Sequence, residues 1–362
     1  MKYLSLLLIF IFSISCVIND ESINIEPKTN SYNNTKRGYT IVVDEFDIKD
    51  FEVLKKQNVN LVRCMLFRTW TSNNKQDLTL YQKWLNKELN KLDLIVEKAK
   101  EYNIKVIIDL HTIPGELYQD GSNRLFYEKQ YAEYYVNVWQ QIASRYGENS
   151  IVYAFELFNE PVELNTNKTV FYNHIELQTQ AAKAIRKIDS KTPIIFSSNL
   201  WNGPEPFFET PISEISNVIY SVHFYYDMSY THQGIDGFSQ DIKSYPKKYG
   251  IWAFDKNEMI KKLEKVRQFQ IDNNAKIFVG EFSVVRWAEG SSEWLEDAIS
   301  IFENYGWDWT YHSWCNYHNN NDVTSLWSLE AKDGSWGNYD TEISEVPTNR
   351  KKIVLKAFEK NK

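Results

Sequence analysis

The stretch IVYAFELFNEP, residues 151–161, decides the fold class of this chain. Its residues Ile151 to Phe158 form a largely apolar run of the length of a strand, and Asn159, Glu160 and Pro161 follow at once. Polar residues and a proline directly after such a run mark the point where a strand ends and a loop begins. The stretch therefore predicts a strand that carries Glu160 at its carboxyl end.

Similar short runs, rich in Val and Ile, recur along the chain and alternate with helical patterns. The other runs are Gly38 to Val43, Asn60 to Leu66, Lys105 to Leu110, Pro193 to Ser197, Val218 to Phe224, Lys276 to Phe282 and Trp307 to Trp314. The helical patterns include Trp84 to Glu101, Met259 to Asn273 and Asn349 to Lys360. Eight strand–helix pairs without a Gly-rich dinucleotide loop favour a closed barrel over an open, doubly wound sheet. We expect an α/β fold, a (β/α)8 TIM barrel, as a single catalytic domain over residues 37–362.

Composition and charge limit the partners of this chain. A net charge of −7 without any basic run argues against nucleic acid, which proteins bind through clusters of Lys and Arg. Aromatic residues make up 15% of the chain, with 12 Trp and 23 Tyr. Flat, amphipathic rings suit the apolar faces of sugars as well as a large core, so composition alone gives only a hint of a carbohydrate ligand.

The N-terminus has the pattern of a signal peptide. Lys2 precedes the apolar run Leu4 to Ile14, which is too short to span a bilayer. Cys16 stands where a bacterial lipoprotein signal places its lipidated cysteine, although ordinary cleavage is the alternative. Residues 17–36 are rich in Asn, Ser, Glu and Lys and are typical of a flexible tether. We expect a signal peptide over residues 1–16 and a secreted or cell-surface protein, anchored by a lipid on Cys16.

The two remaining cysteines, Cys64 and Cys315, are too few for a disulfide framework and lack metal-ligand spacing. Both are expected to be buried thiols, and a single bridge between them stays open.

In a barrel of this kind, polar residues at the carboxyl ends of the strands face the active site, and the loops after the strands surround it. Two long insertions follow predicted strands, at Trp201 to Ser216 and Tyr225 to Asp255. The polar or aromatic residues selected by this position are Arg63, His111, Asn159, Glu160, His223, Tyr225, Glu281, His312 and Trp314.

Glu160 and Glu281 both stand where an apolar run ends, and two such carboxyls can converge across the mouth of a barrel. Hydrolysis of a glycosidic bond needs this pair, because one protonates the leaving oxygen and the other attacks the anomeric carbon or activates water. Chemistry alone leaves the two roles interchangeable. A structural role, as a helix cap or an ion-pair partner, is the alternative for each glutamate. Such a role explains a single glutamate better than it explains two glutamates that both stand at strand ends.

The neighbours of the glutamates distinguish their roles. Arg63 ends an apolar strand, where an unpaired charge is costly, so it needs a carboxylate partner, and Glu281 is the natural one. Such pairing keeps Glu281 ionised as a nucleophile, while Glu160 stays protonated as the acid/base. Tyr225 is a candidate hydrogen-bond donor to Glu281, and Asn159 a candidate ligand of the sugar 2-hydroxyl.

His111 and His223 are expected to bind sugar hydroxyls or to orient the carboxylates, with satisfied core histidines as the alternative. Neither has a second ligand at the spacing of a zinc motif, so no metal or cofactor is expected. Trp70, Trp201, Trp287 and Trp314 follow strands and are candidate stacking platforms for sugars, with Trp314 favoured.

These motifs resemble glycoside hydrolase family 5, the cellulase family, over residues 37–360. The matching segments are LVRCML with Arg63, DLHTIPG with His111, ELFNEP with Asn159 and Glu160, SVHFYY with His223 and Tyr225, and VGEFSV with Glu281. The resemblance implies a (β/α)8 barrel with Glu160 as acid/base and Glu281 as nucleophile. Many members carry a tryptophan after the eighth strand, where this chain reads WTYHSW, so either His312 or Trp314 occupies that place.

The expected activity is an endo-β-1,4-glucanase that cleaves β-glycan chains with retention, through a covalent glycosyl-enzyme. A β-mannanase or an exo-acting β-glucosidase of the same family is the alternative, and a non-catalytic glycan-binding lipoprotein is a remote one. Retention predicts that the two carboxyl groups lie about 5 to 5.5 Å apart.

Overall fold

The computed structural model describes residues 35–361, except residues 69–73, 75, 165–167, 208–213, 236, 251, 315–325 and 334–343. The predicted signal peptide, Cys16 and residues 17–34 of the predicted tether lie outside the described residues, as do Trp70 and Cys315.

The strands close into a parallel barrel in the order β1-β10-β9-β6-β5-β4-β3-β2. Its strands are β1 (Arg37–Val42), β2 (Leu61–Met65), β3 (Lys105–Asp109), β4 (Val152–Glu156), β5 (Ile194–Ser197), β6 (Val218–His223), β9 (Lys276–Glu281) and β10 (Asp308–Tyr311). Each strand overlaps the apolar run predicted for it, so the predicted (β/α)8 barrel is confirmed.

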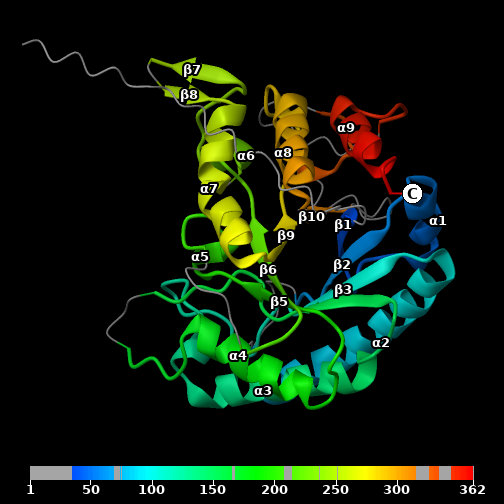
Figure 1. Ribbon diagram of the computed structural model, residues 1–362, viewed down its shortest axis with the longest axis vertical. Helices are drawn as coiled ribbons and strands as arrows, with labels where there is room; N and C mark the ends of the chain where they lie inside the picture. The colour runs from blue at the N-terminus through cyan, green and yellow to red at the C-terminus, as the bar shows by residue number, and fades with distance from the viewer. Residues whose placement is uncertain are drawn as a thin grey trace, which may run out of the picture. The chain divides into compact units, whose positions relative to one another are not determined.

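Helices lie outside the strands (Figure 1). They are α1 (Phe51–Lys56), α2 (Leu78–Tyr102), α3 (Lys129–Tyr146), α4 (His174–Arg186), α7 (Lys256–Asn273), α8 (Ser291–Tyr305) and α9 (Asn349–Phe358). The loops after β5 and β6 contain the short helices α5 (Asn199–Asn202) and α6 (Met228–Thr231), and the second insertion adds the hairpin of β7 (Lys247–Tyr249) and β8 (Trp252–Phe254). None of the described helices is both long enough and apolar enough to cross a membrane.

Helix α2 shows how the sequence determines where a helix begins, which of its residues are buried and where it ends. Asp77 begins it, because its carboxylate accepts hydrogen bonds from the backbone N–H groups of Thr79 and Leu80. The apolar residues at spacings of three and four, from Leu85 to Val96, are buried against the barrel. Asn103 ends the helix in the left-handed conformation, with a φ of 55°.

The inside of the barrel changes from apolar to polar along the strands. Leu61, Ile107, Ala154, Ile195, Ile219 and Phe278, one from each of β2 to β6 and β9, form an apolar cluster separate from the main core. Side chains on one face of a strand recur every second residue. The next positions along β2, β3, β4, β5 and β6 are therefore Arg63, Asp109, Glu156, Ser197 and Ser221, all fully buried. This polar layer lies between the apolar cluster and the strand ends. Cys64, which points the other way from β2, is buried as expected, and burial raises the pKa of its thiol.

Glu88 is a buried carboxyl outside this layer, on α2. It is 1% exposed, and its Oε2 atom has no hydrogen-bond partner among the described residues. Burial, helped by the nearby charge of Asp44, raises the pKa of Glu88 to about 8. The folded protein therefore holds this proton more tightly than the unfolded chain does.

We expect the free energy of unfolding to fall as the pH rises from 4.5, the ordinary pKa of the group, to about 8. Glu88→Gln should remove this loss and raise the free energy of unfolding near pH 9 by at least about 1 kcal/mol. Urea unfolding near pH 5 and near pH 9 would measure it, with Glu97→Gln on the exposed face of α2 as control. The same pH dependence in both variants and the unchanged protein would contradict the prediction.

Candidate active site

Glu281 ends β9 at a local change of register. Val222 of β6 pairs with Val279, but the next residue, His223, pairs with Glu281, so Gly280 has no partner on β6. The carbonyl of this extra residue accepts a hydrogen bond from Thr310 Oγ1 at 2.6 Å. A Cβ atom at position 280 would lie 2.9 Å from His223 Nε2, so only glycine leaves room for the imidazole. The bulge thus brings Glu281 and His223 to the same end of the barrel.

Arg63 is the charged centre of the site, and it is fully buried. Its Nε donates to Glu156 Oε2 at 2.6 Å, and its Nη1 donates to Glu281 Oε1 at 2.7 Å. Its Nη2 lies 3.0 Å from Asp109 Oδ2 and donates to Asn159 Oδ1 at 2.9 Å. The expected contact between Arg63 and Glu281 is therefore present, and two further carboxylates share the same guanidinium.

The surroundings of Glu281 favour its charged form. Burial alone would raise the pKa of this carboxyl, but His312, His223 and Arg63 outweigh burial and hold the pKa well below its usual range. Tyr225 also donates its hydroxyl to Glu281 Oε2 at 2.9 Å. By contrast, burial raises the pKa of Glu156, so the carboxyl beside Glu281 takes a proton more readily than Glu281 does. Glu281 is thus an ionised carboxylate that faces the barrel mouth.

Glu160 follows β4 in a different setting. Its side chain is 29% exposed, against 7% for Glu281, and its Oε1 atom lies 2.8 Å from His223 Nδ1. Its φ is 49°, in the left-handed region that a residue with a side chain adopts at a cost of about 1–3 kcal/mol. Such strain concentrates at functional residues. No arginine or lysine forms an ion pair with Glu160 among the described residues, so its environment differs from that of Glu281.

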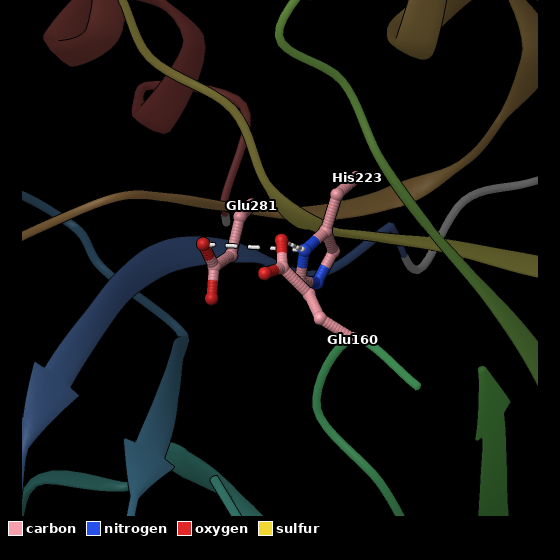
Figure 2. Close-up of side chains that lie close together, drawn as sticks. All are labelled: Glu160, His223 and Glu281. Atoms are coloured by element: carbon pink, nitrogen blue, oxygen red, sulfur yellow. Dashed lines mark hydrogen bonds and ion pairs between the residues drawn. The ribbon is translucent and has the colours of Figure 1, made fainter. Parts of the chain in front are cut away.

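The two carboxyl groups converge beside one imidazole (Figure 2). One ligand atom each of Glu160, Glu281 and His223 lies within 4.8 Å of the others. Among the described residues, these three also form the one group of such residues with the spacing of a metal site. Sequence spacing could not reveal this group, because His223 and Glu281 end β6 and β9, and Glu160 lies in the loop after β4. The same closeness of two carboxyls is what a retaining glycosidase needs.

The other strand-end residues surround this pair. His111 lies 2.8 Å from Asp109 through Nδ1, and its Nε2 lies 3.4 Å from the Asn159 amide nitrogen. His312 Nδ1 lies 3.6 Å from Glu281 Oε2, which is too far for a hydrogen bond, and the ring packs edge-on against Trp327. Burial lowers the pKa of His312, and the charge of Glu281 acts in the opposite direction.

Trp314 lies elsewhere, and the expectation that it forms the sugar platform does not hold. Its side chain is buried in the core against Tyr39, and its indole N–H donates to Asp50 at 2.9 Å. The chain turns after β10, so the backbone N–H of Trp314 donates to Thr40 on β1. His312 is thus the residue of WTYHSW that lies beside Glu281.

The other two tryptophan candidates that the structure describes, Trp287 and Trp201, differ in how exposed their side chains are. Trp287 is half-buried and donates its indole N–H to the backbone of Gln233. Trp201 is 55% exposed, so its ring is open to solvent. Trp201 therefore stays a candidate platform.

Sequence reasoning missed Asp109, Glu156 and His232. The first two lie two residues before His111 and four before Glu160, so the two-residue period of a strand could have identified them as inward-facing partners of Arg63. His232 lies inside the second insertion, where no strand pattern applies. Its ring packs against Tyr225, and burial lowers its pKa to about 4.

The position of Trp314 gives a test. Trp314→Phe removes the hydrogen bond to the buried Asp50, so we expect the free energy of unfolding to fall by about 1–3 kcal/mol. KM for a soluble β-glucan should stay within about twofold of the original, because the ring does not contact the site. Urea unfolding and initial rates measure the two effects. A large rise in KM without loss of stability would restore Trp314 as a platform.

Comparison of the sequence with known proteins assigns the chain to a family. The sequence model of the cellulase family, glycosyl hydrolase family 5, matches residues 28–320. Endoglucanase C of Acetivibrio thermocellus is 30% identical over 254 residues, which cover 62% of this chain and 72% of that protein. Cellodextrinase A of Ruminococcus flavefaciens is 27% identical over 227 residues, 60% of this chain and 65% of that protein.

Solved structures share the fold. The endoglucanase Cel5A of Thermotoga maritima superposes with a TM-score of 0.62 over 89% of this chain and 96% of its own, at 21% identity. A further glycoside hydrolase gives a TM-score of 0.71 over 89% of this chain and 99% of its own, at 20% identity. Since the family model covers most of the barrel, the chain is a glycoside hydrolase and belongs to the cellulase family, glycosyl hydrolase family 5.

Proposed function

We propose that the protein is an endo-acting β-1,4-glucanase that hydrolyses its substrate with retention at the anomeric carbon. The observation that carries the proposal is the pair Glu160 and Glu281, which have oxygen atoms within 4.8 Å of each other, with Arg63 bound to Glu281 and no arginine or lysine paired with Glu160 among the described residues. A retaining pair stands about 5–5.5 Å apart, whereas an inverting pair needs about 6.5 Å or more to admit a water.

The first step uses both carboxyls. Glu281 attacks the anomeric carbon while Glu160 gives its proton to the glycosidic oxygen, so the C–O bond breaks and the leaving chain departs as an alcohol. In the second step, Glu160 takes a proton from a water whose oxygen attacks the same carbon, and Glu281 leaves as a carboxylate. His223, 2.8 Å from Glu160 Oε1, orients the acid/base.

Glu281 loses its negative charge when it bonds to the sugar and regains it when that bond breaks. The contacts of Arg63 suit both states. When Glu281 forms its bond to the sugar, the guanidinium keeps Glu156 and Asp109 as partners, so it is not left as an unpaired buried charge. Asn159 is fixed through its carbonyl oxygen by Arg63, which leaves its amide N–H groups for His111 and a sugar hydroxyl. These contacts hold the machinery in one geometry through both steps.

The relatives support a β-1,4-glucan as the substrate, because Endoglucanase C and Cellodextrinase A are among the curated proteins that match, although a β-xylosidase of Phanerodontia chrysosporium also matches at 22% identity. A β-mannan is the second candidate. The Thermotoga maritima Cel5A, which shares the fold, is described in complex with cellobiose and with mannotriose. Neither name fixes the substrate of this chain, so a direct assay is needed.

Incubation with soluble β-1,4-glucan, β-1,3-glucan, xyloglucan and mannan, followed by product analysis, tests linkage and mode of attack. Endo action predicts a rapid fall in viscosity of the β-1,4-glucan and a spread of oligosaccharide lengths. Release of glucose alone from chain ends would instead favour the β-glucosidase alternative.

The roles of the two carboxyls predict different mutant behaviour. Glu281→Gln should lower kcat on every substrate by at least about 10³-fold, because no covalent intermediate can form. Glu160→Gln should lower kcat/KM on β-glucan by about 10²–10⁴-fold, but far less on aryl glycosides with activated leaving groups, because kcat/KM reports the first step and such leaving groups need no proton. Initial rates and thermal unfolding measure both. Glu264→Gln, exposed on α7, is the control, and equal effects of Glu160→Gln on both substrates would contradict the roles.

We also propose that the protein is exported and that Cys16 carries a lipid anchor. The apolar run Leu4 to Ile14 before Cys16 supports this proposal. In a bacterial host, Cys16→Ala should move the protein from the membrane fraction to the soluble fraction. Retention of that variant in the membrane fraction would contradict lipidation of Cys16.

A further inference from the structure

The helices of the barrel end on the side opposite to the active site. Each strand runs toward Glu160 and Glu281, and the helix that follows returns, because neighbouring strands are parallel. Helix α1 ends at Lys56 before β2, the last turn of α2 contains Lys100 before β3, and Lys187 follows α4 before β5. We call this end the base of the barrel. It comprises the residues from the last turn of each helix to the next strand, and those directly before β1.

Lysines also stand where the strands begin at this base. Lys36 directly precedes β1, and Lys105 and Lys276 are the first residues of β3 and β9. Burial lowers the pKa of Lys36, and the charges of Lys276 and Lys105 lower it further. Asp308 acts in the opposite direction, but it already lies 3.2 Å from Lys276 Nζ and accepts the Lys36 N–H at 2.8 Å. Three lysines thus lie close enough to repel one another.

The base carries more unpaired positive than negative charge. Its exposed acids Glu101, Glu148 and Glu214 each pair with a lysine, at 2.7, 3.0 and 2.6 Å. Among the described residues of the base, Asp272 and Glu359 are the exposed acids without a lysine or arginine partner. The described lysines of the base without an ion pair, which we call the base lysines, are Lys36, Lys55, Lys56, Lys100, Lys187 and Lys356.

Helix formation alone does not explain this excess. Lysines are common in the last turn of a helix because they face the negative end of the helix dipole. That preference does not apply to Lys36, which precedes a strand, and it does not remove acidic partners from the surface. The whole chain carries a net charge of −7, so the unpaired lysines are opposite in sign to the overall charge. A local excess of this kind predicts an anionic partner at the base.

The sequence before the barrel indicates which partner this is. Strand β1 begins at Arg37, so the segment that carries Cys16 joins the barrel at its base. The proposed lipid on Cys16 would bring that end of the barrel to a membrane surface. Anionic lipid headgroups attract clusters of lysine, and such a cluster strengthens membrane binding by a lipid chain. We propose that the base lysines bind anionic phospholipid headgroups, so that Glu160 and Glu281 face away from the membrane.

The inference rests on the proposed lipid anchor, and its test separates the two. The test uses the chain from residue 17 onward, which lacks Cys16 but keeps every described strand and helix. Failure of the anchor would show in the cell fractionation of Cys16→Ala, whereas failure of the base would show in vesicle binding by the unlipidated chain. Unchanged thermal unfolding and an unchanged rate on β-glucan would show that each variant keeps its barrel.

Sedimentation with vesicles measures the binding. One set of vesicles contains phosphatidylglycerol and phosphatidylcholine, and the other contains phosphatidylcholine alone. We expect binding to the anionic vesicles only. It should be lost between about 20 and 300 mM salt, because salt screens the attraction between exposed charges.

Lys36→Gln, Lys56→Gln and Lys100→Gln together should weaken the binding constant by at least about tenfold, since each lysine near an anionic surface contributes about fivefold. The matched control changes to Gln three lysines that are exposed at the other end of the barrel, Lys49, Lys129 and Lys248. It removes the same charge and should alter the binding constant by less than about twofold, because charges far from the lipid surface are screened.

An equal loss of binding in the two triple variants would show that net charge governs binding, and it would overturn the proposal. Equal binding to both kinds of vesicle, or no binding at low salt, would overturn it as well. Tighter binding of soluble polyphosphate than of vesicles, at the same phosphate concentration, would instead assign the base lysines to a polyanion in solution.

Discussion

The site depends on one buried guanidinium that must balance more negative charge than it carries. Arg63 lies within 3.0 Å of oxygen atoms of Asp109, Glu156 and Glu281, and none of these side chains is substantially exposed. Burial makes a carboxylate here costly, so the pKa directions of Glu281 and Glu156 follow from how far their other neighbours compensate. Glu281, with Tyr225 and the imidazoles beside it, keeps its charge, while burial raises the pKa of Glu156.

The carboxylates around Arg63 explain why the inside of the barrel has an apolar part and a polar part. An apolar cluster fills one part of the barrel, and a polar layer of Arg63, Asp109, Glu156 and two serines lies between it and the reacting carboxyls. The polar layer fixes the residues above it, since His111 and Asn159 both bind members of it. The loops can then vary in length, as the two insertions do, without moving Glu281 and its partners.

The sequence was sufficient for the fold and for much of the site, and its limits have physical causes. Apolar runs locate strands, and strand ends locate Glu160, Glu281, Arg63 and Tyr225, because the barrel brings all carboxyl ends together. Trp314 fails this rule, since the chain turns after β10 and points His312 into the site and the indole into the core. A hollow of about 550 Å³ beside Glu163 could not be predicted from the sequence, because its lining combines the loop after β4 and the start of α4 with Asn199 from the loop after β5. A strand pattern carries no information about such loop contacts.

The bulge at Gly280 sets a limit on how this scaffold can be redesigned. Because the unpaired Gly280 sets the register that places Glu281 beside His223, adding or removing a residue in β9 would turn the Glu281 side chain to the other face of the strand. The loops after β4, β5 and β6 are free of that constraint on register. New specificities are therefore best sought by grafting loops onto a β9 of unchanged length.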